Sequence, residues 1–269
     1  MQFPIGVANS VSSNFGYDPL DAMHYAKQSG FSIVQIYVNE KMLQDSKGLE
    51  NLKKELAAQH FSTIYLHAEG DLNPEFLGKD YSKALFSFVE FLEECRLVLH
   101  FDETAALEDM LDVLNRLVRK DIIVYLENYF QSSGQENAEK NMRKYQALFT
   151  LANSHTVQLH PVLDIPRFFQ HDLKMSESDA LEWCYQMFNY FGNRRIPILL
   201  HLIDATDSRL ERNSFCALGE GFLPYEKIFS FLLKNRTLIE GVILEYEDKI
   251  NPLKSREYLK SLWDKHSGR

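Results

Sequence analysis

The chain has 269 residues, 45% of them hydrophobic, which is enough for one large α/β barrel or for two small domains. It carries 29 Lys and Arg against 38 Asp and Glu, a formal charge of -9, so its average surface should repel nucleic acids and anionic membranes. The N-terminus lacks a basic, apolar leader, and no run reaches the ~20 apolar residues of a membrane span. We therefore expect a cytoplasmic protein that acts on a small polar molecule, with its oligomeric state left open.

Short apolar and β-branched runs alternate with stretches of helical spacing along the whole chain. The predicted strands are residues 3–8, 32–38, 62–67, 97–101, 122–127, 157–165, 196–204 and 242–246. The predicted helices are residues 19–30, 48–60, 81–95, 104–120, 136–153, 176–192, 225–234 and 252–266. Strict alternation indicates parallel strands joined by crossovers, and eight such units close into a barrel. The sequence thus predicts a single-domain (β/α)8 TIM barrel over residues 1–269, with an open doubly wound sheet as the alternative. The stretches 131–139 and 206–221 are expected to be loops over the active face.

Ionisable groups follow apolar residues at four successive predicted strand ends. In a TIM barrel these ends share one face, which carries the catalytic groups. Burying a charge beside apolar residues is costly unless a metal or an ion partner compensates. Three carboxylates and one imidazole suit Zn²⁺, Mn²⁺, Co²⁺ or Mg²⁺. The predicted metal ligands are Glu127, Asp164, His201 and Glu245.

Two histidines extend this pattern to six strand ends. His67 ends the third predicted strand and His100 the fourth. A second metal held by these two side chains and bridged by Glu127 is sterically conceivable. The plain alternative is that each polar residue only caps a strand or forms a hydrogen bond, but six such residues on one face favour a shared site.

At these residues the sequence resembles the xylose isomerase-like barrel superfamily, which includes sugar isomerases and epimerases, inosose-processing enzymes and metal-dependent apurinic endonucleases. The resemblance covers nearly the whole chain, and its motifs are YLHAEGDLNP, LVLHFDE, YLEN, VLDIPR, LLHLIDA, LGEG and VILEYED. It implies that the Glu, Asp, His, Glu quartet named above binds the catalytic metal. In the endonuclease branch, the residues corresponding to His67, His100 and Glu127 bind another metal.

The chain departs from the endonuclease branch at the positions of its third metal. Arg167 stands where that branch has a histidine, and Asn213-Ser214-Phe215 stands where it has an Asp-x-His pair. A trinuclear phosphodiesterase centre therefore cannot form. Sugar epimerases also commonly have a histidine at the Arg167 position, and the arginine could instead hold a phosphate or carboxylate of the substrate.

The first functional hypothesis is a metal-dependent isomerase or epimerase of a sugar, cyclitol or related hydroxy-carbonyl compound, working by proton transfer through a metal-stabilised enediolate. Glu127 and Glu245 are the predicted catalytic acid and base. The alternatives are a two-metal, apurinic-endonuclease-like phosphodiesterase and a degenerate barrel that only binds metal. The predicted substrate-binding residues are Arg167, His67, His100 and Tyr129, with Phe130 as a further candidate for stacking on a sugar ring. The glycines of LGEG could present backbone N–H groups to a phosphate, although a turn explains them better.

Overall fold

The structure is a computed structural model, which describes residues 3–58, 61–90, 92 and 94–266. Its strands are β1 (Ile5–Ala8), β2 (Ile33–Val38), β3 (Thr63–Asp71), β4 (Cys95–His100), β5 (Ile122–Glu127), β6 (Leu159–Asp164), β7 (Ile198–Leu202), β8 (Asp204–Ala205), β9 (Phe215–Cys216) and β10 (Ile239–Leu244). Its α-helices are α1 (Pro19–Gln28), α2 (Glu40–Gln44), α3 (Ser46–Ala58), α4 (Pro74–Gly78), α5 (Asp80–Val89), α6 (Leu107–Val118), α7 (Gln135–Ser154), α8 (Pro166–Phe169), α9 (Glu177–Asn193), α10 (Tyr225–Lys234) and α11 (Asn251–His266).

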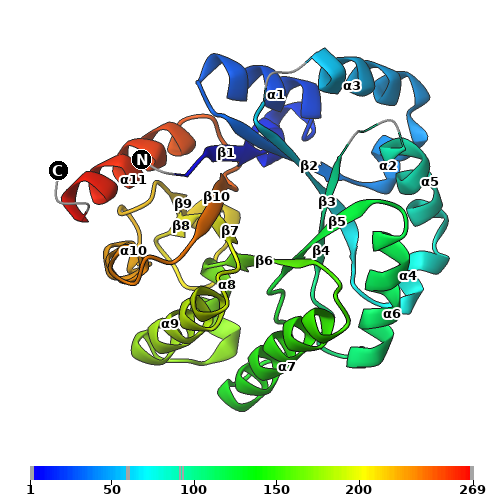
Figure 1. Cartoon of the computed structure of the whole chain (residues 1–269). Helices are drawn as coiled ribbons and strands as arrows, with labels where there is room; N and C mark the ends of the chain where they lie inside the picture. The colour runs from blue at the N-terminus through cyan, green and yellow to red at the C-terminus, as the bar shows by residue number, and fades with distance from the viewer. Residues whose placement is uncertain (1–2, 59–60, 91, 93, 267–269) are drawn as a thin grey trace.

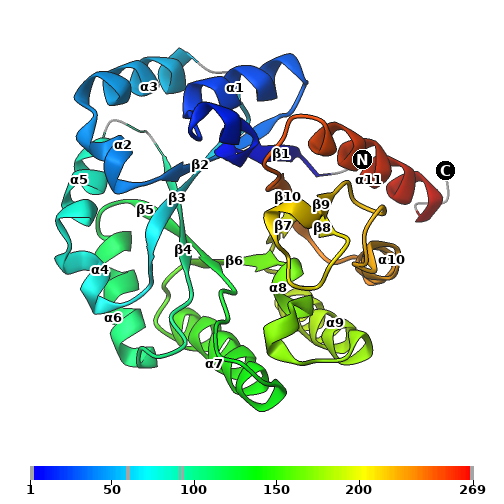
Figure 2. The same ribbon diagram turned by 180° about the vertical axis from the view of Figure 1, so that it is seen from behind.

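Eight parallel strands form a closed barrel in the order β1-β10-β7-β6-β5-β4-β3-β2, and β1 closes the ring by pairing with β2. The helices surround this barrel, and Figures 1 and 2 show them around its outside when the molecule is seen from opposite directions. The two short strands β8 and β9 form a separate antiparallel pair in the loop that follows β7. The predicted (β/α)8 barrel is confirmed.

The barrel interior holds its own apolar cluster. The strands are buried on both faces, because one face meets the helices and the other meets the strands across the barrel. This is why they read as continuous apolar runs in the sequence. The inner cluster takes one side chain from each barrel strand, namely Ala8, Ile33, Tyr65, Val98, Tyr125, Val162, Leu199 and Ile243.

The surrounding helices bury one face each against the strands. In α9, for example, Ala180, Cys184 and Met187 are buried at helical spacing. The hydroxyl of Ser176 accepts a hydrogen bond from the Asp179 N–H at 3.1 Å, which caps the start of this helix. Within the part of the chain that the structure describes, no helix is both long and apolar enough to cross a bilayer.

Some predicted boundaries are wrong. The helix predicted over 81–95 ends at Val89, and Cys95 instead begins β4. The stretch 131–139 is only partly a loop, because α7 begins at Gln135, and the loop 206–221 contains strand β9. The end of the helix predicted over 48–60 lies outside the described residues.

Candidate metal centre

The six predicted metal ligands occupy one layer inside the barrel. Side chains along a strand alternate between its two faces, so a residue two positions after an inner apolar residue also points inward. Seven strands place a polar residue at that position, next to the C-terminal end of the barrel. The inner residues and their polar successors are Ile33 and Gln35, Tyr65 and His67, Val98 and His100, Tyr125 and Glu127, Val162 and Asp164, Leu199 and His201, and Ile243 and Glu245.

His67, His100 and Glu127 form the tightest part of this layer. Their ligand atoms all lie within 4.8 Å of one another, and they are the only such group of three or more His, Cys, Asp or Glu side chains among the described residues. Strand register accounts for part of this, because His100 pairs directly with Glu127 between β4 and β5. Nε2 of His67 lies 3.0 Å from Oε2 of Glu127. The ring centres of His67 and His100 are 4.9 Å apart, and the two rings are inclined at 70° to each other.

His201 links Glu127 to Glu245. Its Nδ1 lies 3.3 Å from Oε2 of Glu127 and 3.2 Å from Oε1 of Glu245. These are ion-pair distances without good hydrogen-bond geometry, so both ring nitrogens of this fully buried histidine lack a hydrogen-bond partner within the described part of the chain. The two carboxylates belong to strands separated by β6 and β7, yet they reach the same nitrogen.

Gln35 was not among the predicted site residues. Its Nε2 donates a hydrogen bond of 2.8 Å to Oε1 of Glu245, and its side chain is buried. Sequence reasoning considered only ionisable groups at the strand ends and therefore passed over an amide. The available signal was its position two residues after Ile33, inside a strand that is otherwise apolar.

Asp164 and Arg167 form an ion pair at the edge of the layer. The Nε of Arg167 donates to Oδ2 of Asp164 at 3.0 Å, and its guanidinium carbon lies 4.3 Å from the ring centre of Tyr129. The ring of His100 stacks on Tyr129 at 4.1 Å. Two groups this close to the ring centre cannot share one face, so both faces of Tyr129 are covered and a substrate would meet its edge or its hydroxyl.

Electrostatics keep Glu127 ionised. Burial alone would raise the pKa of its carboxyl, but contacts with His201 and His67 hold that pKa well below its usual range. A buried carboxylate between two imidazoles is a ready ligand for a cation.

The pKa values of Asp164 and His201 are both raised above their usual ranges. Burial raises the pKa of Asp164 to about 7, and the charges of Glu127 and Glu245 act in the same direction, against Arg167. Burial would lower the pKa of His201, but Glu245 and Glu127 raise it to about 9. The charges of Glu127 and Glu245 act upward on both pKa values, and a cation bound among these carboxylates would relieve that effect.

The residues present fit a divalent metal. Imidazole nitrogens and carboxylate oxygens are the donors that Zn²⁺, Mn²⁺ and Co²⁺ accept. The nitrogens of His201 are buried without a hydrogen-bond partner, and such groups are costly unless something binds them. Of the two predicted ligand groups, His67, His100 and Glu127 form the compact one. In the other, the quartet of Glu127, Asp164, His201 and Glu245, one oxygen of Asp164 is already paired with Arg167.

The glycines of the LGEG segment bind a carboxylate of the chain itself. The N–H groups of Gly219 and Gly221 donate to Oδ2 of Asp204 at 2.9 and 3.1 Å. Those of Leu223 and Ala205 donate to its Oδ1 at 3.2 and 2.9 Å. These donors are not available to a phosphate, so the suggested phosphate site is wrong, and the alternative of a turn is the better account.

We expect Asp204→Ala to destabilise the protein by about 2–4 kcal/mol, because four backbone N–H groups lose their acceptor and two of them, those of Ala205 and Leu223, are buried. Unfolding in urea, followed by circular dichroism, measures this change. Asp207→Ala is the matched control, since Asp207 is more exposed and pairs with Arg209, and an exposed pair of this kind contributes little to stability. Equal losses in the two variants would contradict this role of Asp204.

Phe130 is not available for stacking on a sugar ring. It is buried and packs edge-to-face against Phe101 and Phe168. The suggestion made for it is wrong, because the residue after Tyr129 points into the outer core rather than towards the barrel mouth.

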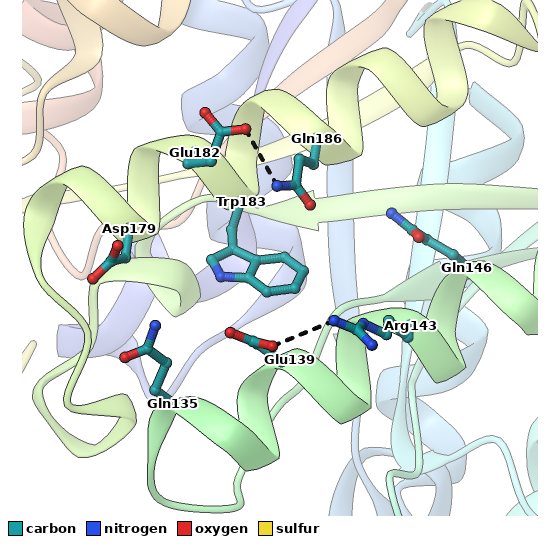
Figure 3. A pocket seen from close by; sticks show the side chains of 8 residues that line it. All are labelled: Gln135, Glu139, Arg143, Gln146, Asp179, Glu182, Trp183 and Gln186. Carbon is teal, nitrogen blue, oxygen red and sulfur yellow. Dashed lines mark hydrogen bonds and ion pairs between the residues drawn. The ribbon is translucent and has the colours of Figure 1, made fainter.

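Two surface hollows differ in their relation to this layer. A hollow of about 480 Å³ is lined partly by Tyr37 and Glu69, and the ring of Tyr37 lies 5.6 Å from that of His67, so this hollow adjoins the site. A cleft of about 370 Å³ lies between α7 and α9, where Trp183 is flanked by Glu139 and Gln186 (Figure 3). Only side chains of these two outer helices line it, so it is separate from the strand-end layer.

Known structures share this architecture. A xylose isomerase domain protein from Planctomyces limnophilus and a D-tagatose 3-epimerase-like protein each match with a TM-score of 0.64 and 17% identity, over 99% of this chain and 99% of theirs. The IolI protein, solved with a bound zinc atom, matches with a TM-score of 0.67 and 13% identity, over 98% of this chain and 99% of its own. The chain shares the closed (β/α)8 barrel fold of these proteins. No protein-family model and no curated protein sequence matches it. At these identities the likeness establishes the fold, so the chemistry has to be argued from the residues of the layer.

Proposed function

We propose that the protein is a divalent-metal-dependent isomerase or epimerase of a sugar, cyclitol or related hydroxy-carbonyl compound. The observation that carries this proposal is the convergence of His67, His100 and Glu127 within 4.8 Å, at the end of the barrel where Glu245 also lies. The similar structures named as an epimerase-like protein and as zinc-bound IolI support the same class of chemistry.

We propose two positions for the metal, which share Glu127. One is the compact group of His67, His100 and Glu127. The other is the quartet of Glu127, Asp164, His201 and Glu245, in which Asp164 can keep Oδ2 on Arg167 and offer Oδ1. A bound divalent cation would supply Lewis-acid stabilisation of the negative charge that develops on substrate oxygens.

Glu245 and Glu127 are the two groups that transfer protons in this proposal. The side chain of Glu245 is 28% exposed and is fixed by Gln35, so it can reach a substrate C–H bond as general base. Glu127 is the proposed partner in the second proton transfer, and its buried, ionised carboxylate also holds His67 and His201 in place. The acidic, enclosed layer suits a small polar substrate better than a nucleic acid.

Protein purified without chelator or added metal should contain a divalent metal, measured by elemental analysis. The metal-loaded protein should exchange a carbon-bound hydrogen of at least one sugar or cyclitol with deuterated solvent, and removal of the metal by chelation should stop this exchange. A metal-free preparation that cannot be loaded with Zn²⁺, Mn²⁺, Co²⁺ or Mg²⁺ would contradict the proposal.

A two-metal phosphodiesterase is the second candidate, and the compact group of His67, His100 and Glu127 is the observation that favours it. Against it stand the acidic surface and the loss of the third-metal residues, because Arg167 pairs with Asp164 and Phe215 packs in β9. Incision of abasic-site DNA with added Zn²⁺ or Mn²⁺ tests this candidate. Robust cleavage would favour the nuclease. No activity in either the deuterium-exchange assay or the DNA-incision assay would favour a barrel that only binds metal.

A further inference from the structure

Arg167 is held in place through only one of its three nitrogens. Its Nε contacts Asp164, and its guanidinium lies over Tyr129, which is stacked in turn on His100. Its Nη1 and Nη2 form no hydrogen bond to any side chain or backbone group among the described residues, and the side chain is 31% exposed. A fixed guanidinium with two accessible amino groups therefore borders the layer of strand-end residues.

This arrangement matches a planar anion. Parallel N–H groups of a guanidinium bind the two oxygens of a carboxylate in a fork-to-fork geometry. The ring contact and the pair with Asp164 already restrict the side chain, so little rotamer freedom remains to be lost when an anion binds. The guanidinium of Arg167 is therefore pre-organised to bind an anion.

The net charge of the layer favours a substrate group with one negative charge over a group with two. A divalent cation together with Arg167 balances the three carboxylates of Glu127, Asp164 and Glu245. A monoanionic carboxylate would then add one charge, next to the guanidinium that binds it. A phosphate dianion would add two, and Arg167 is the only Lys or Arg, in the part of the chain described, that pairs with an acid of this layer.

We propose that the substrate of this site is a hydroxy-carbonyl compound that bears a carboxylate, of the sugar-acid class, and that its carboxylate binds Nη1 and Nη2 of Arg167. This inference rests on the proposed function and narrows its substrate class from neutral sugars to sugar acids.

The test measures binding to the metal-loaded protein by titration calorimetry. The probes are D-glucuronate, D-galacturonate and D-fructuronate, each compared with its parent hexose and with the 6-phosphate of that hexose. At least one acid should bind about tenfold or more tightly than its parent hexose, as expected for a charge-assisted hydrogen-bonded pair. Arg167→Gln should remove this preference, and Arg167→Lys should restore only part of it, because the ammonium lacks the fork.

Arg194→Gln is the matched control. Arg194 also lies over a tyrosine, with its guanidinium carbon 3.8 Å from the ring centre of Tyr190, but it follows α9 and precedes β7, at the other end of the barrel. Its substitution should leave the preference unchanged. Three results would each overturn the inference: no acid outbinds its parent hexose, the preference persists in Arg167→Gln, or the 6-phosphates bind best. The metal content of the same samples separates a failure of this inference from a failure of the proposed function. A wild-type protein that holds no metal would contradict the proposed function, whereas the three results above, in metal-loaded protein, contradict only the sugar-acid inference.

Discussion

Glu127→Gln is expected to lower the affinity for the bound metal by at least about 100-fold, because outer-shell changes alone commonly cost 10- to 100-fold and this change removes a ligand. Glu127 belongs to both proposed metal positions, and its carboxylate contacts His67 and His201. Glutamine keeps the shape of the side chain but carries no charge. Equilibrium dialysis against Zn²⁺ or Mn²⁺, followed by elemental analysis, measures the change.

Glu240→Gln provides the matched control. Glu240 is also a largely buried glutamate of the barrel, but it lies at the opposite end, where it accepts hydrogen bonds from Tyr65 at 3.0 Å and from Arg96 at 3.2 Å. This variant should lose some stability and keep its metal. Unchanged metal affinity in Glu127→Gln, in protein that is still folded, would mean that the metal is not bound in this layer.

Two further substitutions locate the metal within the layer. His100→Ala affects only the compact group, whereas Asp164→Asn affects only the quartet. Loss of metal in one and not in the other assigns the occupied position. Loss of one equivalent in each would indicate two metals.

The order of the elements could be predicted from the sequence because the strands are buried on both faces. Continuous apolar runs separated by helical spacing leave few alternatives, and all eight predicted barrel strands are present. The site layer could be predicted for a related reason. A polar residue at the end of an apolar strand, such as Glu127 or Asp164, is conspicuous, and strand alternation brings such residues to one face.

Side-chain partners could not be predicted in the same way. The sequence gives no sign that Asp164 turns one oxygen towards Arg167, because this depends on how the chain turns from β6 into the short helix α8. It also gives no sign that Asp204 takes the N–H groups of the glycine segment, because this depends on how the loop after β7 folds back. Helix ends near irregular segments were also missed, as at Val89, where no strong stop signal follows the apolar pattern.

Glu245→Gln is expected to slow the exchange of a substrate C–H with deuterated solvent by roughly 100- to 10,000-fold, the usual contribution of a general acid or base. Glu245 is the most accessible of the three carboxylates in the layer, with 28% of its side chain exposed against 3% for Glu127 and 9% for Asp164. Its Oε1 accepts a hydrogen bond from Gln35, which fixes the direction in which the carboxylate points. Nuclear magnetic resonance of the substrate in deuterium oxide measures the exchange.

Glu247→Gln is the control for this prediction, because Glu247 lies two residues further on with a similar exposure of 23% and pairs with Arg212 outside the layer. It should exchange protons at the wild-type rate. The metal content of Glu245→Gln decides how a loss of exchange is interpreted. If metal is retained in the compact group while exchange is lost, Glu245 acts on the substrate as a base rather than as a metal ligand. If metal is lost together with exchange, the quartet is the metal position and Glu245 acts as a ligand. Exchange at the wild-type rate in Glu245→Gln would contradict both roles and would leave Glu127 and Asp164 as the remaining carboxylates of the layer.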